Sequence, residues 1–177
     1  LRRALGDSCA IRVDVNGARD TGFNNGNGGA SGGFSGGVNA ILLRETDSQV
    51  LLGGAFATWN GTARDGLARV STNAAGTLDA TLAPTFRRPG QVFAIEPAPG
   101  GKWYGAGAFQ FIDDTAINHF ARLNADGTFD GTFALAGSGF QNDVDAIAVQ
   151  GDGRILAAGL FSSFNGVTRY NLARLNA

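Results

Sequence analysis

The stretch Val144–Ala177, VDAIAVQGDGRILAAGLFSSFNGVTRYNLARLNA, decides the fold because similar stretches begin twice more in the chain. One begins at Val38 (VNAILLRETDSQVLLGGAFATWNGTARDGLARVST) and one at Val92 (VFAIEPAPGGKWYGAGAFQFIDDTAINHFARLNA), so the three starts are 54 and 52 positions apart. A partial copy opens at Ile11, where IRVDVNGARDTGF matches the later segment ARLNADGTFDGTF. Self-similarity at a fixed period indicates a repeat architecture, in which each unit buries its apolar face against its neighbours.

Each copy contains three short apolar segments of strand length. The first segments read VNAILL, VFAIEP and VDAIAV, the second VLLGGAF, WYGAGAF and ILAAGLF, and the third GLARVS, HFARLN and NLARLN. A GG or DG pair between the first two segments of two copies predicts a two-residue hairpin with positive φ. A weaker fourth strand is expected in TLDATL and TFDGTF. Three strong strands and one weak strand per 52 to 54 residues are typical of a β-propeller blade.

We therefore predict an all-β fold with one β-propeller domain over residues 1–177. Blade boundaries are expected near residues 38, 92 and 144, with a Gly/Asn-rich loop at residues 23–37. Two blades are complete and two are partial, whereas closed propellers need about four to eight blades. The chain is thus expected to be part of a larger propeller, formed either by a longer polypeptide or by associated chains, such as two chains that together supply about six blades.

Composition excludes several partners. The net charge is −1 and the 14 basic residues are scattered, so nucleic acid is not an expected partner. No apolar run reaches the roughly 18 residues that span a bilayer, so we expect no membrane-spanning helix. The chain has no Met and does not begin with a signal-peptide pattern, which predicts a processed product or a fragment. Cys9 is the single cysteine, so no internal disulfide is expected.

An arginine and an aspartate recur at fixed places in the repeat. The arginines are Arg12, Arg69, Arg122 and Arg174, and the aspartates, 8 to 10 residues later, are Asp20, Asp79 and Asp130. An arginine packed between blades needs a carboxylate or several carbonyls to offset its desolvation. We interpret the recurrence as a structural ion pair within each blade, although a ligand site repeated in every blade would give the same pattern.

One loop position favours aromatic side chains, as a carbohydrate site between blades would. Trp59 and Phe164 occupy it in two copies, and Ile112 occupies it in the third. Because Ile112 interrupts the aromatic set, a hydrophobic plug is the better interpretation, and Trp59 and Phe164 remain a second hypothesis as ligand contacts.

The remaining candidate metal-binding residues are better interpreted as turn and loop residues. NADGTFD (residues 124–130) has oxygen ligands at calcium-like spacing but lacks a terminal Glu, so we interpret it as a turn. His119, the single histidine, is expected to be a loop residue and not a metal ligand. No nucleophile paired with a base, phosphate loop or metal-ligand cluster is visible, so we expect no catalytic activity, no cofactor and no metal site.

The pattern VDAIAVQGDGRILAAGLFSSFNG…LARLNADGTFDGTF resembles the bacterial delta-60 repeat, a predicted β-propeller module of secreted and cell-surface proteins. The resemblance runs from about Ile11 to Ala177. The residues that carry it are Asp152, Gly153, Gly159, Phe161, Ala173, Arg174, Leu175, Asp126, Gly127 and Asp130. The copy at Val38 departs from the pattern, because RETDSQ replaces the Asp-Gly hairpin.

The resemblance implies the propeller fold and an extracellular, cell-surface or periplasmic location, and it brings no catalytic residues. We accordingly expect a non-catalytic structural or protein-interaction module. Its expected partners are other protein subunits or further blades of the same protein. A carbohydrate-binding propeller with sites between blades, and hence glycans as partners, is the alternative.

Overall fold

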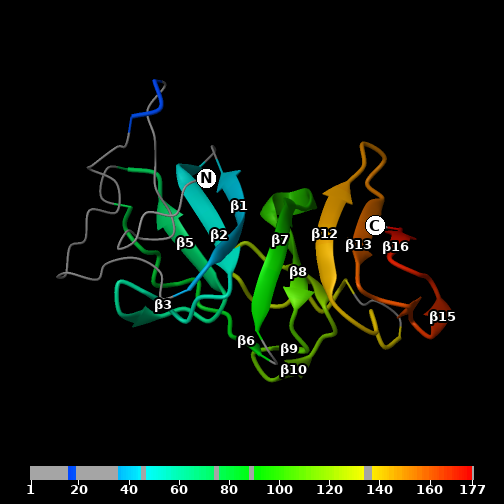
Figure 1. Ribbon diagram of the computed structural model, residues 1–177. Helices are drawn as coiled ribbons and strands as arrows, with labels where there is room; N and C mark the ends of the chain where they lie inside the picture. Colours follow the sequence, from blue (N-terminus) through cyan, green and yellow to red (C-terminus); the bar gives the residue numbers. More distant parts are fainter. Residues whose placement is uncertain are drawn as a thin grey trace.

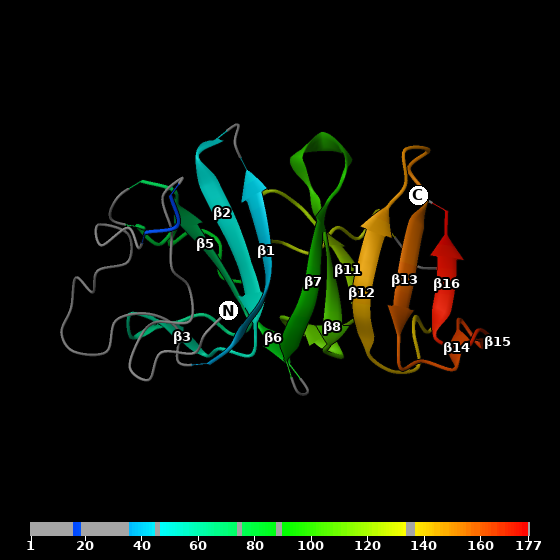
Figure 2. The ribbon, with the colours of Figure 1, turned by 45° about the horizontal axis from the view of Figure 1, so that its top comes forward.

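The computed structural model describes residues 16–18, 36–44, 47–73, 76–87, 90–133 and 137–176. Within these ranges the chain forms three blades that stand side by side in the order of the sequence, with the first and third blades at opposite ends (Figure 1, Figure 2). The prediction of an all-β fold built from repeated blades is confirmed. Cys9, Arg12, Asp20 and residues 23–35 of the Gly/Asn-rich loop lie outside the described residues.

Each blade is a three-stranded antiparallel sheet in which the three main strands are neighbours in chain order. The first blade contains β1 (Val38–Arg44), β2 (Gln49–Gly54) and β5 (Leu67–Ser71). The second contains β7 (Gln91–Pro97), β8 (Trp103–Ala108) and β11 (Phe120–Leu123). The third contains β12 (Val144–Val149), β13 (Ile155–Gly159) and β16 (Leu172–Leu175). All of β8 is buried, because the second blade has a neighbour on each face.

A short hairpin sits in the loop between the second and third strand of every blade. These hairpins are β3 (Thr58–Trp59) with β4 (Thr62–Ala63), β9 (Phe111–Ile112) with β10 (Thr115–Ala116), and β14 (Ser163–Phe164) with β15 (Val167–Thr168). The chain that leaves the first blade adds β6 (Phe86–Arg87) to β9 of the second blade. Phe140 makes the equivalent single bridge to Phe164, so each crossing ties a blade to the loop of the next.

The expected fourth strand is reduced to one bridge in each of the two blades where it is described. Leu78 bridges Val70, and Phe129 bridges Leu123. The segment then turns away, because the carboxylates of Asp79 and Asp130 accept hydrogen bonds from the backbone N–H two residues later. This local turn competes with continuation of the strand.

The turn between β12 and β13 also differs from the prediction. In place of a two-residue hairpin, the backbone N–H of Gln150 donates to the carbonyl of Arg154, and the N–H of Gly153 donates to the carbonyl of Gln150. The three intervening residues end with Gly153 at φ 85°. This is a type I turn closed by a left-handed glycine, the usual three-residue hairpin. In the second blade, the corresponding turn contains the short 3₁₀ segment η2 (Pro99–Gly101).

Near the end of the second strand of each blade lies a glycine that has no room for a side chain. The first strands carry an irregularity near their start, between Val92 and Ala94 in the second blade. This brings the backbone so close to Gly107 that a Cβ there would lie 2.1 Å from the carbonyl oxygen of Gln91. Gly54 and Gly159 are enclosed in the same way. The recurrent glycine before the Ala-Phe or Leu-Phe pair is therefore a packing requirement.

Each blade has two faces, which we call leading (toward the preceding blade) and trailing (toward the next). One apolar cluster joins Leu51 and Leu67 on the trailing face of the first blade to residues of the second blade that include Ile95 and Trp103. A second cluster joins the trailing face of the second blade to the leading face of the third. Its members include Tyr104, Ala106, Phe120, Val144, Ile147 and Ala157. The cores therefore lie between the blades, and each sheet is stabilised by its neighbours.

The interface between the first two blades is tight at Gly53. A Cβ at this position would lie 2.7 Å from Cγ1 of Val92 and 2.9 Å from Cδ1 of Ile95. We expect Gly53→Val to lower the free energy of unfolding by about 1–3 kcal/mol through overpacking, measured by urea denaturation. The control is Thr168→Ile on the short hairpin of the third blade, an exposed strand position where we expect a change of at most about 0.5 kcal/mol. Equal losses in the two variants would contradict this packing.

Candidate functional site

The recurrent arginine and aspartate meet in the first blade. Arg69 on β5 donates from Nε to Oδ2 of Asp79 at 2.8 Å, and its Nη2 lies 2.6 Å from the same oxygen. The other carboxylate oxygen accepts the backbone N–H of Thr81 at 2.8 Å and its hydroxyl at 2.6 Å. Both oxygens are therefore occupied within the blade, as a structural ion pair requires.

The second blade repeats this cluster with one addition. Nε of Arg122 donates to Oδ2 of Asp130 at 2.7 Å, and Thr132 donates twice to Oδ1. Lys102 also donates to Oδ2 at 2.7 Å, while the Arg122 guanidinium lies 4.5 Å above the ring centre of Phe133. Sequence reasoning missed Lys102 and the two threonines. The sequences Asp79-Ala80-Thr81 and Asp130-Gly131-Thr132 carry a signal that could have identified the threonines.

Arg69 also ties its blade to the next one. Its Nη1 donates to the backbone carbonyl of Ala125 at 2.6 Å, in the outer turn of the second blade. That turn packs closely on the segment that leads from the first blade to β6, since a Cβ on Gly127 would lie 3.0 Å from Cγ of Leu82. A single guanidinium thus joins a carboxylate in one sheet to a carbonyl in its neighbour.

Arg174 on β16 occupies the same repeat position but is exposed. The position eight residues later, where an aspartate would be expected, falls beyond the printed sequence. Of the four arginines singled out in the sequence, the structure therefore brings Arg69 and Arg122 together with their aspartates.

The electrostatics of the two carboxylates follow from these contacts. Burial raises the pKa of Asp79, but the hydrogen bonds from Thr81 and Arg69 outweigh it and lower the pKa to about 2. The hydrogen bonds from Lys102, Thr132 and Arg122 hold the pKa of Asp130 far below its usual range. A carboxylate held so firmly in its charged form is poorly suited to act as a general acid or base near neutral pH.

The loop position proposed for ligand contacts is packed inside the protein. The Trp59 side chain is 1% exposed and that of Ile112 is 0% exposed, and Phe164 is half-buried against Phe140. Trp59 and Ile112 are enclosed beside their hairpins, so neither side chain offers an open face against which a sugar could pack.

The calcium-like turn is closed by its own side chains. Oδ1 of Asp126 accepts the backbone N–H of Thr128 at 3.0 Å and its hydroxyl at 2.7 Å, and Asn124 donates to that hydroxyl. The described ranges contain no group of three or more His, Cys, Asp or Glu side chains arranged to hold a metal ion.

His119 is a buried turn residue with φ 66°. Its Nδ1 lies 3.1 Å from the carbonyl oxygen of Gly107 and 3.3 Å from a carboxylate oxygen of Asp143, just before the third blade. Asn171, at the same repeat position, has φ 60° and donates to the carbonyl of Gly159. Gly66 fills the position in the first blade with φ 79°, so the shared requirement is a left-handed backbone, and His119 and Asn171 add a side-chain contact to the second strand.

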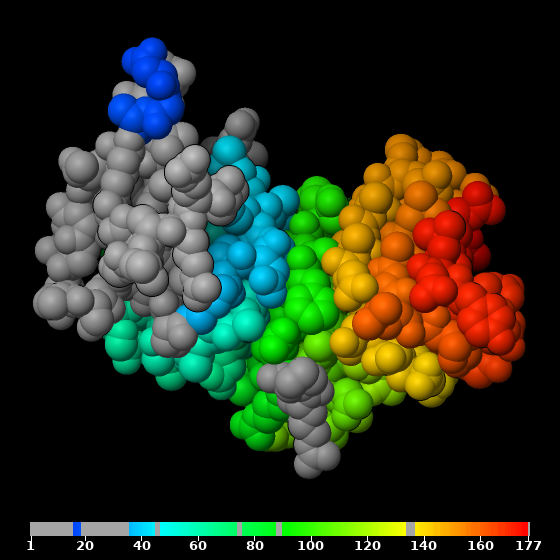
Figure 3. Space-filling model, in the orientation of Figure 1, coloured from blue at the N-terminus to red at the C-terminus, as the bar shows by residue number. Residues whose placement is uncertain are grey.

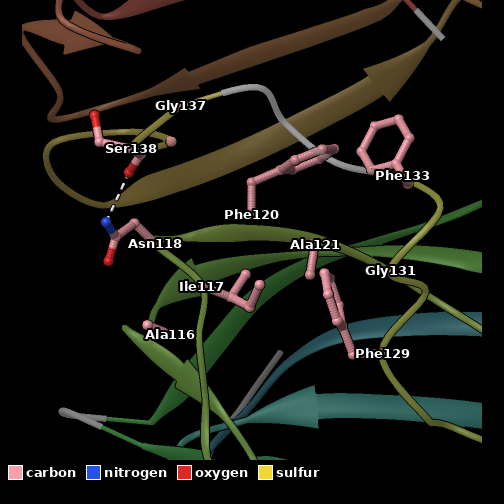
Figure 4. A pocket seen from close by; sticks show the side chains of 11 residues that line it. Ala116, Ile117, Asn118, Phe120, Ala121, Phe129, Gly131, Phe133, Gly137 and Ser138 are labelled. Carbon is pink, nitrogen blue, oxygen red and sulfur yellow. Dashed lines mark hydrogen bonds between the residues drawn. The ribbon is translucent and has the colours of Figure 1, made fainter.

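A cleft of about 400 Å³ opens beside the second blade (Figure 4). Its wall includes Phe120, Phe129 and Phe133, and its rim is tied by a 2.7 Å hydrogen bond from Asn118 to the carbonyl of Ser138. The described side chains that line it carry no ionisable group, so the cleft offers apolar contact but no acid or base.

The trailing face of the third blade is an open, mainly apolar surface. It consists of Ala146, Ala148, Leu156, Ala158, Leu172 and Arg174. Leu172 is 59% exposed, whereas the equivalent Leu67 and Phe120 are fully buried against the next blade. Leu160 and Tyr170 extend the surface at 64% and 72% exposure. The blade forms the orange and red end of the molecule (Figure 3).

The comparisons with known proteins bear on the fold. A family model described as a domain of unknown function (DUF5122) beta-propeller matches residues 99–133 and 150–177. This is the delta-60 repeat family, so the resemblance seen in the sequence is confirmed. No curated protein matches the chain. In the described part of the chain, no helix is long and apolar enough to cross a membrane.

The contacts of Arg69 should contribute to the stability of the fold. Arg69→Ala removes the partner of a half-buried carboxylate together with the hydrogen bond to the second blade. We expect a loss of about 1–3 kcal/mol in the free energy of unfolding, measured by urea denaturation. Arg174→Ala at the exposed equivalent should change it by at most about 0.5 kcal/mol. Equal effects would show that Arg69 behaves as a surface residue.

The stability contributed by Asp79 should depend on pH. Because the pKa of Asp79 is lowered from 3.8 to about 2, its contribution to stability is complete above the unfolded value and is lost as the pH falls through the folded value. The difference in unfolding free energy between the wild type and Asp79→Asn should be largest at neutral pH and shrink between about pH 4 and pH 2. Asp152→Asn, at an exposed turn, is the control. A difference for Asp79→Asn that does not vary with pH would contradict the assignment.

Proposed function

Because the chain carries repeats of the DUF5122 β-propeller family, we propose that it is a non-catalytic structural module that binds protein through the trailing face of its third blade. The observation that carries the proposal is the exposure of Leu172 at a position where the other two blades bury Leu67 and Phe120 completely. An open apolar surface of this kind favours association with protein.

The ionised groups support a structural role. The carboxylates of Asp79 and Asp130 are fully engaged in hydrogen bonds within their blades. The trailing face offers Arg174 as its charged group among five apolar side chains, which suits a protein surface better than a polyanion. Glycan binding is less well supported, because the ring of Trp59 is buried.

A location outside the cytoplasm is the second part of the proposal. It rests on the resemblance of the sequence to repeats of secreted and cell-surface proteins. Such a module would act as a scaffold subunit whose blades are completed by neighbouring protein.

The proposal is tested in the native source. We expect the wild-type protein to be recovered from the extracytoplasmic fraction in a complex larger than a single chain, as measured by size-exclusion chromatography under native conditions. Leu172→Glu places a charge on the trailing face and should release the chain from that complex. Asp152→Lys, at the exposed hairpin turn, is the control and should leave the complex intact. Identical elution of the wild type and Leu172→Glu would contradict the proposed function.

A further inference from the structure

The first blade carries exposed apolar residues that complement the open face of the third. Ile41 and Leu43 on β1 are 65% and 55% exposed. Ile41 is the repeat equivalent of Ile95 and Ile147, which are 7% and 8% exposed because each packs on the preceding blade. Part of β1 reaches the surface of the molecule (Figure 3). One chain therefore presents an open trailing face at one end and an open leading strand at the other.

The way in which neighbouring blades meet shows how these two surfaces would fit. β7, the first strand of the second blade, packs across β1 and β2 of the first blade, and β12 packs in the same way across β7 and β8. The first strand of each blade therefore makes the main contact with the first two strands of the blade before it. By this rule β1 would lie across β12 and β13 of another third blade.

The side chains on the two surfaces are compatible with that contact. Ala158 is the repeat equivalent of Gly53 and Ala106. Ala106 is fully buried in the same cluster as Val144 and Ile147, so an alanine is accommodated at this point of a blade interface. In the proposed contact, Ala158 would face the Ile41 of the partner subunit, as Gly53 faces Ile95 within the chain.

We propose that the occupant of the trailing face is a second copy of this chain, docked head to tail with its β1 across β12 and β13. The inference rests on the proposed function and names its partner. The contact is heterologous, because it joins two different surfaces, and it makes a closed assembly only if the rotation closes. Two chains of three blades each would provide a number of blades within the range of about four to eight found in closed propellers.

Disulfide trapping tests this contact in the 177-residue chain. In a Cys9→Ser background, one protein carries Ala158→Cys and a second carries Ile41→Cys, both at positions that are at least partly exposed. At the equivalent positions of the first two blades, a Cβ on Gly53 would lie 2.9 Å from Cδ1 of Ile95, so the proposed contact would bring the two thiols close together. Mixing the two proteins under mild oxidation should give a covalent dimer on a non-reducing gel, and neither protein alone should give one efficiently. Asp152→Cys mixed with Ile41→Cys is the matched control and should remain monomeric.

The outcomes separate this inference from the proposed function. A dimer of Ala158→Cys with itself would indicate a symmetric contact and overturn the head-to-tail arrangement. Failure of the mixed pair to cross-link, while Leu172→Glu still releases the chain from its native complex, would overturn the inference and leave the proposed function standing with a different partner. If Leu172→Glu has no effect on that complex, the proposed function fails first.

Discussion

The structure depends on the burial of each blade's trailing face beneath the leading face of the next. A three-stranded sheet on its own has little apolar area to bury, whereas stacked sheets share a continuous core. In this chain the shared cores contain most of the large aromatic side chains, among them Trp103, Tyr104, Phe109 and Phe120. The outermost face in any such stack needs a cover, and the properties of the third blade follow from that requirement.

The polar interactions serve the same stacking. The Arg69 guanidinium binds Asp79 in its own blade and the carbonyl of Ala125 in the next blade. The cluster therefore links the end of one sheet to the neighbouring sheet. Thr81 and Thr132 fix the carboxylates from the other side and end the fourth strand after a single bridge. In the first blade, the ion pair thus links a strand, the turn that follows it and the neighbouring blade.

The repeat in the sequence was enough to predict the all-β propeller fold, because a 52–54-residue period with three apolar segments permits few other architectures. The pairing of Arg69 with Asp79 followed from their fixed spacing. The shortened fourth strand could not be predicted, since it depends on an Asp-x-Thr turn competing with the sheet. Lys102 was missed because it reaches Asp130 from the turn before β8, a contact that spacing along the chain does not reveal. The burial of Trp59 agrees with the hydrophobic plug that Ile112 indicated at the equivalent loop position.

In the proposed dimer, the exposed β1 of one chain covers the trailing face of the third blade of another. Sedimentation velocity of the purified protein over a range of concentrations measures this association. We expect a species with twice the 18.2 kDa mass of the chain, whose share grows with concentration. A single species of 18.2 kDa at every concentration would contradict it.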